Sequence, residues 1–164
     1  MSSKGLKKYK KDSLERLRTL KLVMAALIAA IAAFSFMLGF ARISGSSMEP
    51  TLKNGQLVLC WKLESYYKKG DIVSIRLPDG ERVVKRIAAV GGDTVDIKEG
   101  VLYVNGIAEE GQAETEPGAS LSYPLTIEKG RVFVLGDNRS VSSDSRHYGP
   151  ILLDQIKGKI LINE

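Results

Sequence analysis

The sequence predicts a mainly β protein, an antiparallel β-sheet or barrel-like domain that follows one N-terminal transmembrane helix. Three observations predict this fold class. Residues 22–41 are uncharged and almost wholly apolar, helical periodicity is hard to find after residue 42, and short β-branched runs recur between glycine and turn residues. These runs are Gln56–Trp61, Asp71–Arg76, Arg82–Val90, Thr94–Lys98, Val101–Val104, Arg131–Leu135 and Lys159–Ile162.

The apolar segment Leu22–Ala41 contains no charge and no proline. As a helix, its 20 residues are about 30 Å long, the thickness of a hydrocarbon core. Asp12-Ser-Leu-Glu15 has the spacing of a capping box, which predicts that the helix begins there. A cleavable signal peptide ending at Ala41 is the alternative, although the run is longer than the usual apolar region of about 7–15 residues.

The net charge of +5 belongs to the N-terminal tail. Residues 1–21 carry eight Lys or Arg against Asp12 and Glu15, whereas residues 22–164 carry 16 basic and 17 acidic residues. A basic segment beside a membrane span is typical of a cytoplasmic tail that contacts anionic lipid, rather than of nucleic-acid binding. We therefore expect a cytoplasmic N-terminus, a cell-membrane location and an extracytoplasmic domain.

The chain has too few cysteine and histidine residues for an intramolecular disulfide or for a metal site built from these side chains. Cys60 is the one cysteine, so no intramolecular disulfide can form, and it lies in an apolar run typical of a buried residue. His147 is the one histidine. The sequence therefore predicts no metal site and no cofactor.

Residues 42–164 are long enough to form one domain with its own core. Asp79-Gly80 and Asn105-Gly106 are typical of tight hairpin turns. Residues 107–129 are acidic and contain two prolines, which predicts a surface excursion rather than a second domain.

A candidate nucleophile, Ser47, follows the apolar segment closely. Five residues separate it from Ala41 and reach at most about 17 Å, so a substrate of Ser47 would have to approach the lipid. A serine hydroxyl needs a base at neutral pH. His147 could serve, but its polar loop setting favours a surface or structural role.

Lys85 is the stronger candidate for the base. In a strand over Arg82–Val90, Lys85 shares a face with Val83 and Ile87, and burial against apolar neighbours lowers the pKa of a lysine. An isolated lysine in a strand more often reaches solvent, so the interpretation depends on further motifs.

Those motifs occur in order along the chain: Ser47-Met-Glu-Pro-Thr-Leu52, Lys69-Gly-Asp-Ile-Val73, Val84-Lys-Arg-Ile87 with Gly92-Asp93, and 136–146, which reads Gly-Asp-Asn-Arg-Ser-Val-Ser-Ser-Asp-Ser-Arg. Together they resemble the type I signal peptidases, in particular the short Gram-positive-type members. The resemblance covers nearly all of residues 42–164 and the N-terminal anchor. It implies a serine endopeptidase with Ser47 as nucleophile and Lys85 as general base, cleaving signal peptides from exported preproteins after small residues.

The resemblance also implies supporting roles. Ser142 would hydrogen-bond and orient the Lys85 amine, while Asp144 and Arg146 would hold their loop through an ion pair. Gly45 stands where some members have a serine hydroxyl for the oxyanion, so the backbone N–H of Ser47 is the expected donor. Ser46 does not fit the motif because Met48 is two positions away.

The family's substrate lies extended along the strand that carries the lysine, as in strand addition. Residues at the pocket-forming positions are Ile43, Met48, Leu52, Val58, Val83 and Val84. Each is also a plausible core residue. Asp71, Asp93, Asp137 and Asn138 are expected to shape turns. The implied partners are signal peptides, membrane lipid and the protein export machinery.

Two other functions remain open at this point. Self-cleaving repressors also pair serine with lysine on a related β fold, but they carry a DNA-binding segment, and no helix-turn-helix candidate lies in the short tail here. A membrane-tethered β module that binds exported proteins without cleaving them is the other alternative. Such a module would be expected to lose Ser47 or Lys85, and both are present.

Overall fold

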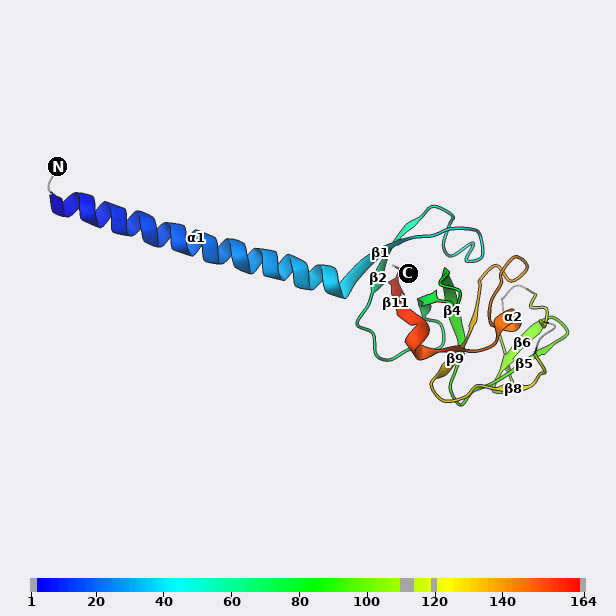
Figure 1. The fold of residues 1–164 in the computed structure, drawn as a ribbon. Helices are drawn as coiled ribbons and strands as arrows, with labels where there is room; N and C mark the ends of the chain where they lie inside the picture. Colours follow the sequence, from blue (N-terminus) through cyan, green and yellow to red (C-terminus); the bar gives the residue numbers. More distant parts are fainter. Residues whose placement is uncertain (1–2, 110–113, 119–120, 163–164) are drawn as a thin grey trace. The chain divides into compact units, whose positions relative to one another are not determined.

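The computed structural model describes residues 3–109, 114–118 and 121–162 (Figure 1). The chain divides into two units, residues 1–37 and 38–164. The first is one helix, α1 (Ser3–Met37), and the second is built mainly from antiparallel strands. The predicted fold class is therefore confirmed.

Both predicted ends of the N-terminal helix are wrong. The helix already runs from Ser3, so Asp12 lies within it rather than at its start. It ends at Met37, and the last four residues of the predicted span belong to strand β1 (Leu38–Arg42), which pairs with β2 (Leu57–Trp61). Apolar character alone does not separate helix from strand, and Gly39 weakens the helix where the ladder to β2 offers partners to the backbone.

Helix α1 contains a candidate membrane span, Leu14–Met37, with a mean hydropathy of 2.2. Its 24 residues correspond to about 36 Å of helix, enough for a hydrocarbon core. Its large apolar side chains, such as Leu22, Ile28 and Phe34, are exposed within the chain itself. They are therefore not covered by any other part of the chain that the structure describes, as expected of a helix surrounded by lipid.

The second unit contains two antiparallel sheets. The larger has the strand order β1-β2-β11-β3-β4-β9-β10 and the smaller the order β7-β6-β5-β8. The remaining elements are β3 (Ile72–Arg76), β4 (Arg82–Val90), β5 (Thr94–Lys98), β6 (Val101–Val104), β7 (Ile107–Ala108), β8 (Leu125–Thr126), β9 (Arg131–Leu135), α2 (Ser145–Tyr148), β10 (Ile151–Leu152), the 3₁₀ turn Leu153–Gln155 and β11 (Ile156–Leu161). Each predicted run corresponds to one of these strands.

The acidic segment 107–129 is more ordered than predicted. It contributes β7 and β8 to the smaller sheet, and Ile127 is buried in the core. These strands have two residues each, which is too short for a recognisable alternation. The parts 110–113 and 119–120 lie outside the described residues.

Strand β4 separates two apolar clusters. Val84 packs on the cluster that contains Ile43 and Met48, whereas Val83 packs on the cluster that contains Ile75 and Ile87. A third cluster lies around Phe133 and supports the smaller sheet. Because successive side chains of a strand point to opposite faces, Lys85 extends on the Val83 side, as predicted.

Candidate active site

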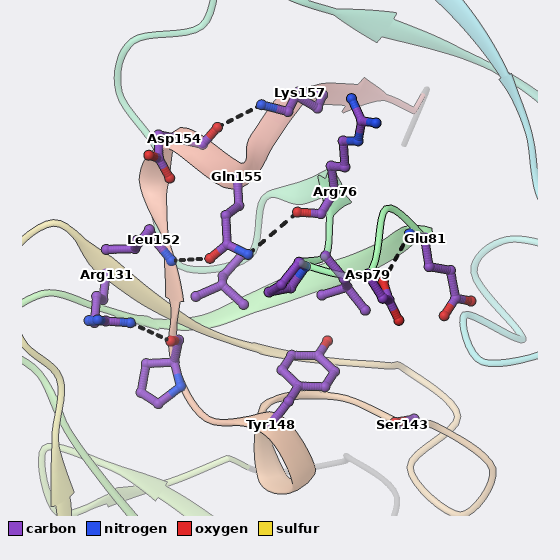
Figure 2. A pocket seen from close by; sticks show the side chains of 14 residues that line it. Arg76, Asp79, Glu81, Arg131, Ser143, Tyr148, Leu152, Asp154, Gln155 and Lys157 are labelled. Atoms are coloured by element: carbon purple, nitrogen blue, oxygen red, sulfur yellow. Dashed lines mark hydrogen bonds between the residues drawn. The ribbon is translucent and has the colours of Figure 1, made fainter.

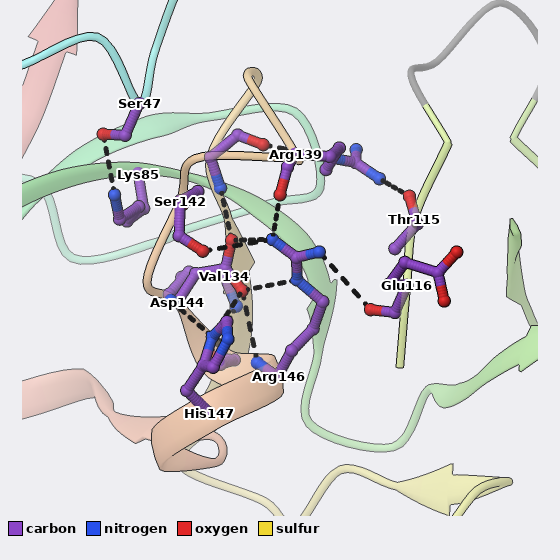
Figure 3. Close-up of polar contacts among 12 residues, drawn as sticks. Ser47, Lys85, Thr115, Glu116, Val134, Arg139, Ser142, Asp144, Arg146 and His147 are labelled. Atoms are coloured by element: carbon purple, nitrogen blue, oxygen red, sulfur yellow. Dashed lines mark hydrogen bonds and ion pairs between the residues drawn. The ribbon is translucent and has the colours of Figure 1, made fainter. Parts of the chain in front are cut away.

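Ser47 and Lys85 are in direct contact. Lys85 Nζ donates a hydrogen bond to Ser47 Oγ over 2.8 Å (Figure 3). Ser47 opens the turn that follows β1, and Lys85 comes from the centre of β4, 38 positions later in the chain. The hydroxyl is half-buried, whereas Lys85 is only 3% exposed. This contact places an amine within proton-transfer distance of an alcohol oxygen.

Burial lowers the pKa of Lys85 below its ordinary value of 10.5. The negative charges of Asp144 and Glu81 oppose this shift, Arg146 adds to it, and Asp137 opposes it again. Desolvation is the largest of these effects and determines the direction. A larger fraction of Lys85 is therefore neutral near physiological pH than of a lysine in water.

Backbone contacts fix the position of the Ser47 segment. The N–H of Leu52 donates to the carbonyl of Met48 over 2.8 Å, and the N–H of Asn138 donates to the carbonyl of Ser47 over 3.0 Å. Met48 itself is buried in the core. The nucleophile's main chain is thus attached to the Gly136–Arg146 loop on one side and to the core on the other.

Gly45 is required by its backbone conformation. Its φ of 84° lies in the left-handed region that favours glycine, and its N–H donates to Asn54 Oδ1 over 3.0 Å. A turn role therefore accounts for this residue, and its absent side chain offers no donor to an oxyanion.

Gly136 allows the loop to approach the nucleophile closely. A Cβ at this position would lie 2.5 Å from the carbonyl oxygen of Ser47 and closer still to Ser142 Oγ. The glycine is therefore needed for the two segments to pack together.

Asp144 and Arg146 form the predicted ion pair. Arg146 donates to the two carboxylate oxygens of Asp144 over 2.8 and 2.9 Å, and the N–H of Gly136 adds a bond of 3.0 Å (Figure 3). Burial alone would raise the pKa of Asp144, but the hydrogen bonds from Arg146 and Gly136 outweigh it, so the pKa is lowered from 3.8. Arg146 also donates to the carbonyls of Arg139 and Ser142 and so holds the loop together.

His147 has the structural role that was predicted. It lies in α2, where its Nδ1 accepts a hydrogen bond from the N–H of Asp144 over 3.3 Å. Its side chain is 53% exposed, and Lys85 rather than His147 is bonded to Ser47.

Ser142 lies in the same loop, but the expected hydrogen bond to Lys85 is not formed. Its Oγ is buried and makes no well-aligned hydrogen bond among the residues that the structure describes, but it lies near Asp144 and helps to lower the pKa of that carboxyl. The role that the resemblance implies for this hydroxyl therefore stays a prediction.

A groove of about 410 Å³ contains both Ser47 and Lys85 and is called the catalytic groove below. Four of the six predicted pocket residues line it, namely Ile43, Met48, Val83 and Val84. Leu52 and Val58 do not line this groove, although they belong to the same buried cluster as Met48, and Val58 lines a different cavity. The position of a residue within the motif does not by itself show whether that residue lines the groove or only packs in the core.

The chain matches the family described as signal peptidase, peptidase S26, over residues 16–163. It belongs to this family. It is therefore a peptidase, a hydrolase of the signal peptidase I type.

Individual relatives agree with this assignment. Signal peptidase I of Bacillus licheniformis is 36% identical over 155 residues, which cover 84% of this chain and 81% of that protein. Thylakoidal processing peptidase 1 of Arabidopsis thaliana is also 36% identical, over 71% of this chain, but the match spans only 39% of the plant protein. The crystal structure of a signal peptidase I from Enterococcus faecalis V583 aligns with a TM-score of 0.50 and 30% identity, covering 60% of this chain and 98% of that one.

Several polar contacts of this signal peptidase were not predicted from sequence. Asp137, expected only to shape a turn, accepts two hydrogen bonds from Arg86 over 2.8 and 2.7 Å. Arg139 is buried and donates to Thr115 Oγ1 over 2.6 Å, which attaches the loop to the acidic segment. The many polar residues in 136–146 indicated that this segment forms polar contacts. They did not indicate which residues it contacts, because no sequence pattern links partners that lie so far apart along the chain.

Asp71, Asp93 and Asn138 do have the local turn contacts that were predicted. Asp71 accepts from the N–H of Lys68 over 3.1 Å, Asp93 from the N–H of Val90 over 2.9 Å, and Asn138 from the hydroxyl of Ser140 over 3.1 Å. Cys60 is buried, and burial raises the pKa of its thiol, in agreement with a core role. Within the described ranges, no group of three or more His, Cys, Asp or Glu side chains could hold a metal ion.

Proposed function

We propose that this protein is a membrane-bound serine endopeptidase that removes N-terminal signal peptides from exported preproteins through a Ser47/Lys85 dyad. The observation that carries the proposal is the 2.8 Å hydrogen bond between Lys85 Nζ and Ser47 Oγ, with Lys85 buried. Membership of the signal peptidase family supports the substrate class. The name of the Bacillus licheniformis relative, signal peptidase I, supports it as well.

Acylation begins with neutral Lys85. In the protonated state its Nζ donates to Ser47 Oγ, and after loss of that proton the same contact can run in reverse, with the hydroxyl donating to the amine. Lys85 takes the hydroxyl proton as Oγ attacks the carbonyl carbon of the scissile bond. The backbone N–H of Ser47 stabilises the oxyanion, and the C–N bond then breaks as Lys85 returns its proton to the leaving amine.

Deacylation repeats the same proton transfers. Lys85, neutral again, removes a proton from a water molecule, whose oxygen attacks the acyl carbon. The ester bond to Ser47 Oγ breaks, Oγ receives the proton from Lys85, and the released signal peptide carries the new carboxylate. No metal or organic cofactor is needed for either half of the reaction.

The free edge of β4 supports binding of the substrate as an extended strand. Arg82–Arg86 pair with β3 on one side, whereas pairing with β9 on the other side begins only at Arg86. Residues 82–85 thus have an edge to which a peptide can add as a strand. The small side chain before the scissile bond would contact Ile43, Met48 and Val84, which line the catalytic groove.

A membrane location follows from α1 and the charge of the tail. Leu14–Met37 would cross the bilayer with the basic N-terminal residues in the cytoplasm, in accord with the positive-inside rule. Ser47 is ten positions beyond Met37, so at most about 36 Å of chain separates them. Membrane lipid and the export machinery that delivers preproteins are the expected partners.

Cleavage of a preprotein in detergent by single-residue variants of the full chain tests the proposal. Ser47→Ala and Lys85→Ala should each abolish cleavage while keeping the thermal unfolding midpoint near that of wild type. Ser65→Ala and Lys53→Ala, at exposed positions outside the catalytic groove, are matched controls that should cleave normally. Turnover by either dyad variant would refute the dyad, and inactivity of the wild type would favour a binding module.

A further inference from the structure

Residues 114–118, a described part of the acidic segment, lie against the Gly136–Arg146 loop and are called the strap below. The N–H of Thr115 donates to the carbonyl of Gly100 in the β5–β6 turn over 2.8 Å, which attaches the strap to the smaller sheet. Thr115 is 1% exposed, although its neighbours on either side are exposed. Its side chain therefore points inward from a segment that lies mostly at the surface.

Two buried arginines of the loop donate hydrogen bonds to the strap. Arg139 Nη1 donates to Thr115 Oγ1 over 2.6 Å, and Arg146 Nη1 donates to the carbonyl of Glu116 over 3.3 Å (Figure 3). The two arginines are only 4% and 3% exposed. The backbone of Arg146 also approaches Gly118 so closely that a Cβ there would overlap it. The strap therefore packs on the loop and supplies acceptors to two desolvated cations, for which a lost hydrogen bond is destabilising.

Both arginines connect the strap to the segment that contacts the nucleophile. Arg139 Nε donates to the carbonyl of Gly136 over 3.0 Å. Arg146 binds Asp144, whose carboxylate accepts the N–H of Gly136 over 3.0 Å. Gly136 in turn lies so close to Ser47 that a Cβ would come within 2.5 Å of the Ser47 carbonyl oxygen. Two short series of contacts thus lead from the strap to the main chain of the nucleophile, and both pass through Gly136.

The strap itself lies outside the spaces beside the dyad that a substrate could fill. None of its five residues lines the catalytic groove, and none lines the larger cavity of about 880 Å³ beside Tyr148 and Leu152 (Figure 2). The apolar walls of the groove, Ile43, Met48 and Val84, come from other segments. An effect of the strap on the reaction therefore has to pass through the loop rather than through contact with the peptide.

We propose that the strap is a positioning element for the reaction, in which Thr115, by accepting from Arg139, holds Gly136 and hence keeps Ser47 Oγ at hydrogen-bonding distance from Lys85 Nζ. This inference rests on the proposed function. A displacement of about 1 Å at a reacting atom lowers the rate on the order of a hundredfold. Loosening of the loop should therefore lower kcat, whereas binding of the peptide to the groove walls, and with it KM, should be retained.

Preprotein cleavage by Thr115 variants of the full chain in detergent tests the strap. Thr115→Val keeps the shape of the side chain but removes the acceptor, so kcat should fall by about tenfold or more while KM stays within about twofold of wild type. Thr115→Ser keeps the hydroxyl and should restore kcat to within about threefold of wild type. Thr126→Val is the matched control, because Thr126 is exposed in β8 and its hydroxyl contacts that of Thr94. It should leave both constants unchanged.

Thermal unfolding should show that the three variants are folded at the assay temperature. Arg139→Lys is a second variant for the case that Thr115→Val does not fold, because a single ammonium does not reproduce the fork that donates to both Gly136 and Thr115. It should show the same loss of kcat at unchanged KM. An unchanged kcat in folded Thr115→Val, an equal loss in Thr115→Ser, or a change confined to KM would overturn the positioning role while leaving the dyad intact. If the wild type does not cleave the preprotein, the proposed function itself fails and the positioning role with it.

Discussion

Replacement of Asp144 by Asn should be among the most destabilising single changes in this domain. The carboxylate is fully buried and accepts four hydrogen bonds, three from Arg146 and one from Gly136. Asn keeps the shape but removes the charge and turns one acceptor into a donor that faces other donors. Arg146, itself 3% exposed, becomes a buried cation without its counter-ion. Loss of one partner of a buried pair costs about 3–5 kcal/mol.

Urea unfolding of the full chain in detergent measures this change, with Trp61, the single tryptophan, as the fluorescent probe. Glu128→Gln is the control, because Glu128 pairs with Arg131 over 3.1 Å on the surface. That exposed pair should be worth less than about 1 kcal/mol. A cost for Asp144→Asn no larger than that of the control would refute the view that the buried pair holds the loop.

The same pair predicts a pH dependence of stability. Because the folded pKa of Asp144 lies below 3.8, its contribution is fully present above that pH and is lost as the pH falls through the folded pKa. The difference between wild type and Asp144→Asn should therefore shrink in strong acid. A difference that stays constant down to unfolding would contradict the assigned pKa direction.

Three further changes test the site. Lys85→Met should raise the free energy of unfolding at pH 7, because it removes a charge that burial disfavours. The gain should fade as the pH approaches 10.5, where wild-type Lys85 is neutral in the folded state. Gly136→Ala should cost about 1–3 kcal/mol by overpacking against Ser47 and should reduce kcat, whereas Gly39→Ala meets only the flexible end of a lysine and should cost less. Ser142→Ala should change stability by about 1 kcal/mol or less, because its buried hydroxyl makes no well-aligned hydrogen bond in the described part of the chain. It should nevertheless lower kcat/KM if the hydroxyl orients Lys85 during the reaction. Urea unfolding and preprotein cleavage check all three, and normal activity of Ser142→Ala would remove this residue from the mechanism.

The strands were predictable because each is a short β-branched run bounded by turn residues. Arg82–Val90 was predicted with its observed bounds, and its period-two alternation placed Lys85 on the Val83 face. The junction at Met37 was not predictable from hydropathy, because the same apolar composition suits a lipid-facing helix and a strand with a buried face. Pairing with β2 resolves that ambiguity, and it depends on residues 15 to 23 positions away.

The two reacting side chains were predictable from motifs, whereas the contacts that support them were not. Ser47 and Lys85 were recognised by their short sequence contexts, but the bond between Arg139 and Thr115 joins segments 24 positions apart with no pattern to connect them. For Leu52, in contrast, the motif gave the wrong expectation. Its motif position suggested a substrate contact, but Leu52 does not line the groove, whereas Met48 of the same buried cluster does.

The pH dependence of kcat/KM for preprotein cleavage tests the central claim most directly. If neutral Lys85 is the base for Ser47, kcat/KM should rise with pH through a single ionisation with a midpoint below 10.5, and no value of pH should restore activity to Lys85→Met. A profile that is flat across this range, or one that Lys85→Met reproduces, would contradict it.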